Sequence, residues 1–158
     1  MTTPQYPARL ISAGPVRTRL NRAGEVVVSP TAVSAAVAAG LFENLACFID
    51  HSSGNPSVRD LLGVWHDVTW DAAAGAAHGV LTAYENSETE PVLARLEQQL
   101  AAAANGRAVP DIGISLVFHP RWAAGGRVLD GFQHIESADL ASDSFFPPRL
   151  EHAKKQVH

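Results

Sequence analysis

Two side chains far apart in the sequence have the types that nucleophilic catalysis needs. Ser115 lies in the middle of the apolar segment 111–118, and His51 follows the apolar segment 45–50. A serine hydroxyl is a poor nucleophile at neutral pH, and a histidine, with an unperturbed pKa of about 6.5, suits the task of taking its proton. Because the two residues are 115 − 51 = 64 positions apart, only the fold can bring them together. Most serines inside strands do no chemistry, so the pair is a hypothesis.

The alternation of side chains around Ser115 predicts a β-strand with two unlike faces. A period of two puts neighbouring residues on opposite sides of a strand. One side then carries Ile112, Ile114 and Leu116, and the other carries Gly113, Ser115 and Val117. Gly113 has no side chain, which would let a substrate or another backbone approach closely. This strand is the segment around which we expect the rest of the chain to be arranged.

The remaining reactive side chains favour structural roles. The single cysteine, Cys47, lies in an apolar segment and is expected in the core, and one cysteine excludes an intramolecular disulfide. His66 and His78 fall in the two strands of one expected hairpin and could be neighbours on a sheet face. No close spacing of His and Cys is typical of a zinc site, so we expect neither a metal nor another cofactor. The three tryptophans are expected in the core or at its rim.

Length and composition favour a single domain. The chain has 158 residues and a formal net charge of −4, without a basic stripe for nucleic acid or a long block of like charges. The first residues lack the pattern of a signal peptide, and no apolar run reaches the roughly 20 residues of a membrane span. We therefore expect a soluble cytoplasmic protein that binds neither nucleic acid nor membrane. Residues 1–148 would form the domain, and 149–158 a polar tail.

Turn residues divide the chain into short strands and two helices. The first helix should have Ser29 as its N-cap, Pro30 in its first turn and Gly40 at its end. The second should begin with a capping box of Ser87 and Glu90 and end near residues 105–106. The expected strands cover 8–13, 25–28, 45–50, 61–70, 76–84, the segment around Ser115, 127–135 and 137–141. Neighbouring strands joined by turns predict an α+β fold, a small, mostly antiparallel β-barrel with flanking α-helices.

The order of these features along the chain resembles one family. The matching segments are 11–14 (ISAG), 29–33 (SPTAV), 48–51 (FIDH), 61–65 (LLGVW), 79–81 (GVL), the helix from Ser87, 113–116 (GISL) and 137–141 (SADLA). In this order they are similar to the capsid maturation (prohead) proteases of tailed bacteriophages, which are related to the herpesvirus assemblins. The resemblance covers roughly residues 11–148. It implies a β-barrel serine protease with helices around it.

The resemblance assigns roles to particular residues. It implies that His51 is the general base and Ser115 the nucleophile. The third catalytic group would be Asp139, with Glu136 and His134 as the alternatives; parity along a regular strand disfavours Glu136, unless a bulge intervenes. Backbone amides near Ser115 and Leu116, beside Gly113, could bind the oxyanion, and Arg121 or Arg127 could assist.

The resemblance also implies a biological setting. The protein would be a serine endopeptidase that cleaves scaffold and major capsid proteins, and itself, inside the assembling prohead in the bacterial cytoplasm. A homodimer is expected, and the chain could be a whole product or a self-cleaved fragment. The alternative is a catalytically inactive, capsid-associated or scaffold-like barrel protein. In either case the loop 52–60, rich in Ser, Gly, Asn and Pro, is expected to be mobile and to border the substrate cleft.

Overall fold

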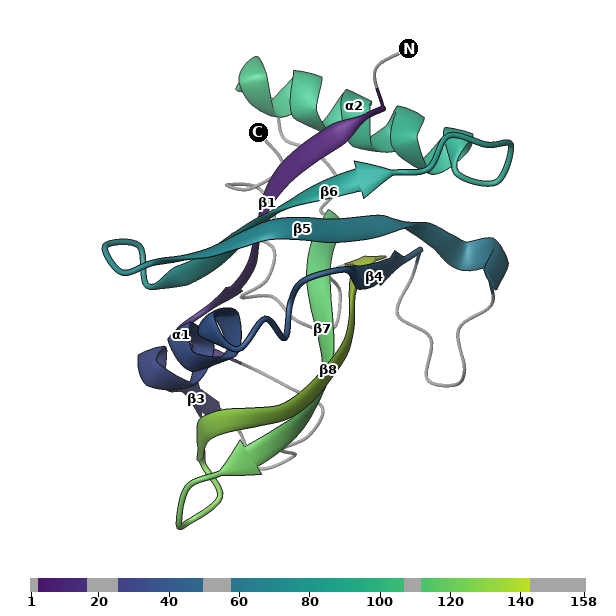
Figure 1. The fold of residues 1–158 in the computed structure, drawn as a ribbon. Helices are drawn as coiled ribbons and strands as arrows, with labels where there is room; N and C mark the ends of the chain where they lie inside the picture. Colours follow the sequence, from purple (N-terminus) through teal and green to yellow (C-terminus); the bar gives the residue numbers. More distant parts are fainter. Residues whose placement is uncertain (1–2, 17–25, 50–57, 107–111, 143–158) are drawn as a thin grey trace.

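The computed structural model describes residues 3–16, 26–49, 58–106 and 112–142. This part of the chain forms a curled sheet with two α-helices and one short 3₁₀ helix (Figure 1). The strands are β1 (Gln5–Ser12), β2 (Gly14–Val16), β3 (Val26–Val28), β4 (Leu45–Phe48), β5 (Leu61–Asp71), β6 (Ala76–Ala83), β7 (Ile112–Trp122) and β8 (Val128–Ser142). The helices are α1 (Pro30–Ala38), η1 (Val58–Asp60) and α2 (Glu90–Ala104).

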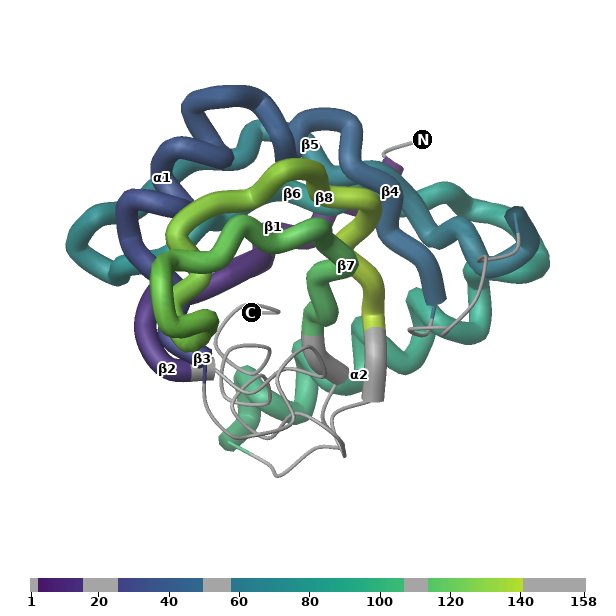
Figure 2. Tube along the Cα trace, turned by 90° about the horizontal axis from the view of Figure 1, so that it is seen from below, coloured from purple at the N-terminus to yellow at the C-terminus, as the bar shows by residue number. Residues whose placement is uncertain are grey.

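The sheet is mixed and open, which corrects the expected antiparallel barrel. Its strand order is β1-β6-β5-β4-β8-β3-β2, with β7 paired to β8. The pairs β2–β3, β4–β5, β5–β6, β7–β8 and β1–β6 are antiparallel, but β3 and β4 both run parallel to β8. Viewed from below, the sheet curls into part of a barrel (Figure 2). The α+β class is as predicted. The parallel pairings were missed because they join segments far apart in the sequence, which local turn signals do not report.

A single long strand, β8, connects the two halves of the sheet. The sequence predicted two strands here, 127–135 and 137–141, where the structure has one of 15 residues. Register shifts against β7 accommodate extra residues of β8, so the strand bends without ending. Along its other edge, the first part of β8 pairs with β3 and the last part with β4. The curl of the sheet follows from this long, bent strand, which Figure 1 shows in the lower half of the molecule.

The first helix begins and ends as predicted. Ser29 is the N-cap of α1, and its hydroxyl accepts the backbone N–H of Ala32 at 3.4 Å. Gly40, just beyond the helix, has a φ of +74°, a conformation that glycine adopts without strain. Val33 and Ala36 are buried on the face that packs against β5, β6 and β8. This buried face of α1 therefore covers the part of the core next to β8.

The second helix starts later than predicted. Its N-cap is Thr89 and not Ser87, so the expected capping box is wrong. The Asn86 side chain accepts the N–H groups of Glu88 (2.9 Å) and Thr89 (3.0 Å), and the buried Thr89 hydroxyl donates to the Tyr84 carbonyl at 2.5 Å. The Asn86 carbonyl also accepts the N–H of Glu90 at 3.0 Å, the group that the Ser87 side chain would have capped, and the helix begins at Glu90. Within the described residues, no helix is long and apolar enough to cross a membrane.

The core joins the strands to both α-helices. It combines alternate residues of the strands with the inner face of the helices. Trp65, as predicted for a tryptophan, is buried there, and its indole N–H donates to the carbonyl of Ala138 at 2.8 Å. This bond links β5 to β8. Gly63 lies so close to β6 that an added Cβ would be 2.9 Å from the Cα of Ala83, so this glycine is required by packing.

Candidate active site

The hairpin of β7 and β8 brings Ser115 opposite Asp139. The two residues are direct register partners in the antiparallel pair. Side chains of such partners project from the same face of a sheet, with Cβ atoms about 4.5–5.5 Å apart. Ser115 is 2% exposed and Asp139 is 4% exposed. The predicted nucleophile and the predicted third group are therefore buried neighbours.

The faces of β7 near Ser115 differ as the alternation predicted. Ile114 and Leu116 are buried in the apolar core, together with Ala138 and Leu140 of β8. The opposite face carries the buried polar residues Ser115, Ser137 and Asp139. Ser115 pairs with Asp139, and Ser137 lies two positions from Asp139 along β8. A buried polar group is costly unless it is hydrogen-bonded. These three residues thus form a buried polar site beside the apolar core.

Two donors from different places hold the carboxylate of Asp139. The backbone N–H of Phe48, in β4, donates to Oδ1 at 3.1 Å, and the hydroxyl of Ser137 donates to Oδ2 at 3.1 Å. The parallel register of β4 and β8, with Ala46 opposite Ser137, brings the end of β4 to this carboxylate. Neither donor was identified from the sequence. Ser137 could have been, because it precedes Asp139 by two positions and so shares its face.

Cys47 lies on the core side of β4, close to Asp139. Its side chain is fully buried, as predicted. Burial raises the pKa of the Cys47 thiol well above its usual range, and the carboxylate of Asp139 raises it further. The thiol therefore remains protonated at neutral pH, and thiolate chemistry is disfavoured.

The predicted base, His51, lies outside the described residues, as does most of the loop 52–60. The chain is described up to Ile49, which forms a parallel bridge with Leu140, the residue after Asp139. It resumes at Val58 with η1, where the carbonyl of Asp60 accepts the N–H of Ile49 at 2.6 Å. Both described ends of this segment thus meet beside the end of β8. The roles of His51 and of the loop remain predictions.

The alternatives for the third group lie farther along the same hairpin. A register shift between Val117 and Phe118 leaves Glu136 as an extra residue of β8, so the parity argument against it does not hold. The Glu136 carboxylate is 2.9 Å from Nε2 of His119, and the rings of His119 and His134 are 5.8 Å apart. His119 is four residues from Ser115, about 13 Å along a strand. The exposed cluster of His119, His134 and Glu136 is therefore set apart from Ser115 by its distance along the hairpin, and not by the face on which its side chains lie.

The two arginines considered for the oxyanion lie at the other end of the hairpin. Arg121 is six residues beyond Ser115, about 20 Å along the strand, and pairs with Asp130 at 3.6 Å. Arg127 precedes the first residue of β8. The expectation that either arginine assists at Ser115 is therefore wrong. Leu116 pairs with Ala138 and Gly113 pairs with Ala141 in the register, and the role of their backbone N–H groups at the oxyanion stays a prediction.

His66 and His78, in the β5–β6 hairpin, are not cross-strand partners. A register shift places His78 opposite Thr69 and His66 opposite Val80. His66 contacts Asp67 (2.8 Å) and Thr82 (2.5 Å) through its two ring nitrogens. Over the described ranges, no group of three or more His, Cys, Asp or Glu side chains could hold a metal ion.

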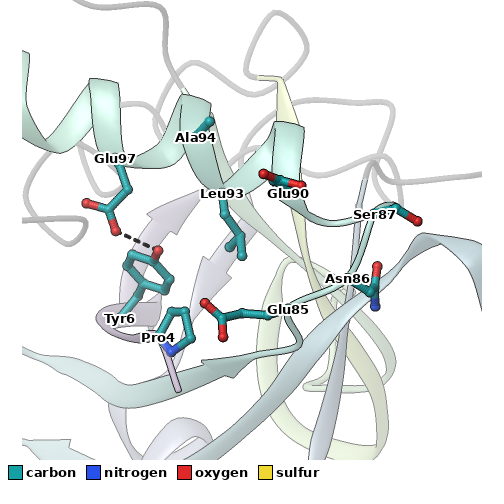
Figure 3. A pocket seen from close by; sticks show the side chains of 9 residues that line it. All are labelled: Pro4, Tyr6, Glu85, Asn86, Ser87, Glu90, Leu93, Ala94 and Glu97. Atoms are coloured by element: carbon teal, nitrogen blue, oxygen red, sulfur yellow. Dashed lines mark hydrogen bonds between the residues drawn. The ribbon is translucent and has the colours of Figure 1, made fainter. Parts of the chain in front are cut away.

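A separate pocket of about 660 Å³ lies between the start of β1 and α2. Figure 3 shows its side chains, which are Pro4, Tyr6, Glu85, Asn86, Ser87, Glu90, Leu93, Ala94 and Glu97. The Tyr6 hydroxyl donates to Glu97 at 2.7 Å. Burial raises the pKa of Tyr6 above its usual range, and this hydrogen bond to Glu97 raises it further. The lining includes a serine but no histidine, so it does not offer a nucleophile–base pair.

The fold is similar to that of a known phage protein. The solved structure of the bacteriophage T4 capsid assembly protease, gp21, superimposes with a TM-score of 0.52 and 14% sequence identity. The match covers 88% of this chain and 82% of that chain. No family model matches the sequence, and no curated protein matches it either. At this identity the likeness shows a common fold, and the roles of individual residues must be argued from the geometry.

Proposed function

We propose that this chain is a serine endopeptidase that cleaves scaffold and major capsid proteins, and itself, inside an assembling phage head. The observation that carries the proposal is the buried pair of Ser115 and Asp139 on adjacent strands. The fold shared with a capsid assembly protease supports the same reading. The related expectation of a homodimer goes with this proposal, and light scattering tests it.

His51 is the base in this proposal because the chain connection allows it to reach Asp139. Phe48 donates its N–H to Asp139, and His51 follows Phe48 by three residues. Three residues span at most about 11 Å, so the imidazole can reach the carboxylate and the serine beside it. A carboxylate can accept about four hydrogen bonds, so one that holds two protein donors can also accept from an imidazole.

The reaction then follows the usual course of a serine protease. His51 takes the proton of Ser115 as Oγ attacks the carbonyl carbon of the peptide bond. Asp139 holds the imidazole in the required tautomer and stabilises its charged form. Backbone N–H groups near Ser115 and Leu116 bind the developing oxyanion. His51 returns the proton to the leaving amine, and water then releases the acyl group by the same steps.

One observation favours the alternative, a barrel protein of the capsid that has no catalytic activity. Ser115 is only 2% exposed, and a nucleophile must meet its substrate. In that reading, Ser115, Ser137 and Asp139 only hold the hairpin and β4 together. The two functions predict different reactivity of the Ser115 hydroxyl.

A fluorophosphonate probe separates the two. Attack by Ser115 Oγ on phosphorus displaces fluoride and leaves a stable phosphonyl ester, which mass spectrometry locates. The enzyme proposal predicts labelling that is lost in Ser115→Ala and in His51→Ala, with the double variant little worse than either, because the two residues act as a unit. Absence of labelling in well-folded wild-type protein would refute the proposal and favour the inactive barrel. Processing of a co-expressed scaffold provides the second readout.

A further inference from the structure

We infer that Ser137 is a positioning residue of the candidate active site, which fixes the carboxylate of Asp139 so that it can orient the base. The inference rests on the proposed function and adds a residue with a defined task to it. Ser137 is 5% exposed, and its hydroxyl donates to Oδ2 of Asp139 at 3.1 Å. It is thus a buried side chain in direct contact with the predicted orienting group.

The register of three strands sets this contact. Ser137 pairs with Val117 of β7 on one side and with Ala46 of β4 on the other. It precedes Asp139 by two residues on the same strand, so both side chains project from one face. The hydroxyl therefore reaches the carboxylate without a change in backbone conformation. A valine and an alanine on either side offer no competing side-chain acceptor.

Two donors on different oxygens fix a carboxylate better than one. The terminal torsion of an aspartate is broad, so a single hydrogen bond leaves the carboxylate plane free to turn about it. In this site the Phe48 N–H holds Oδ1 and the Ser137 hydroxyl holds Oδ2. The plane of the carboxylate is then set by β4 and β8 together. Loss of the Ser137 hydroxyl would remove one of these two donors and leave the Phe48 N–H in place.

The expected effect is on the chemical step and not on binding. Displacement of a supporting group by about 1 Å costs on the order of 100-fold in rate. Ser137→Ala should therefore slow fluorophosphonate labelling of Ser115 by roughly 10–100-fold at saturating probe, with the half-saturating probe concentration unchanged within about threefold. Ser137→Thr retains the hydroxyl and should recover most of the rate. Ser12→Ala removes another buried serine hydroxyl, in β1, and is the matched control that should label at the wild-type rate.

A double-variant cycle distinguishes positioning from general support of the fold. If Ser137 acts through Asp139, Ser137→Ala should cost little in an Asp139→Asn background, because the oriented carboxylate is already gone. The same fold-loss in both backgrounds would overturn the inference. So would a labelling rate of Ser137→Ala within twofold of wild type while Ser115→Ala is unreactive. Wild-type protein that does not label at all would instead refute the proposed function, and this inference with it.

Discussion

Substitutions of Asp139 should separate the effect on stability from the effect on catalysis most clearly. Replacement by alanine removes the acceptor of two donors, the Phe48 N–H and the Ser137 hydroxyl. Each buried polar group left without a partner costs about 1–3 kcal/mol, so Asp139→Ala should lose about 2–6 kcal/mol of unfolding free energy. Domains of this kind have only about 5–15 kcal/mol in total. The alanine variant should therefore be only marginally stable, or unfolded, at physiological temperature.

Asp139→Asn should behave differently. The amide oxygen can accept from Phe48 N–H, and the amide NH₂ can donate to the Ser137 oxygen, so both contacts have a replacement. We expect a loss of no more than about 1 kcal/mol in stability. The amide cannot favour the imidazole tautomer that the proposed base needs, so the rate should fall by roughly 10⁴-fold.

Two assays on the same preparations test this reasoning. Urea unfolding followed by tryptophan fluorescence gives the stability, and fluorophosphonate labelling of Ser115 gives the reactivity. A fully stable Asp139→Ala would contradict the structural part of the argument. Near wild-type labelling in Asp139→Asn, combined with loss in Glu136→Gln or His134→Ala, would move the orienting role to that residue.

Three further predictions concern the frame around the site. Gly63→Ala forces a Cβ against the Thr82 carbonyl and to 2.9 Å from the Cα of Ala83. It should lower the unfolding free energy, measured in urea, by about 2–3 kcal/mol. A loss below about 1 kcal/mol would mean that β5 and β6 separate easily. Trp65→Phe leaves the buried Ala138 carbonyl without its donor and should cost about 1–3 kcal/mol in the same assay, and an unchanged midpoint would contradict the bond. The raised pKa of Tyr6, caused first by burial and then by Glu97, means that the folded state favours the neutral phenol. Its contribution to stability is present below the unperturbed value of 10.0 and is lost as pH rises above it, because only the unfolded chain then releases the proton easily. Urea midpoints between pH 8 and 11 should fall more steeply for wild type than for Tyr6→Phe, and parallel curves would exclude this contribution.

The sequence alone determined the features that depend on neighbours along the chain. The period of two around Ser115 predicted its face correctly, because alternation is a local property of a strand. The N-cap Ser29 and the turn at Gly40 predicted both ends of α1 for the same reason. The second helix shows the limit of such signals. Ser87 and Glu90 had the spacing of a capping box, but the Asn86 carbonyl accepts the Glu90 N–H that Ser87 would have capped, and α2 starts at Glu90.

Only the tertiary structure decided what surrounds Ser115. The contact between the Phe48 N–H and Asp139 joins residues 91 positions apart, through a parallel pairing that no turn signal announces. The shift in register at Glu136 likewise depends on how β8 bends against β7, which the residue types of either strand do not specify. Local periodicity fixes which face a side chain occupies, because that depends on the backbone of one strand. Which side chains meet there depends on strand order and register, which are set by packing over the whole sheet.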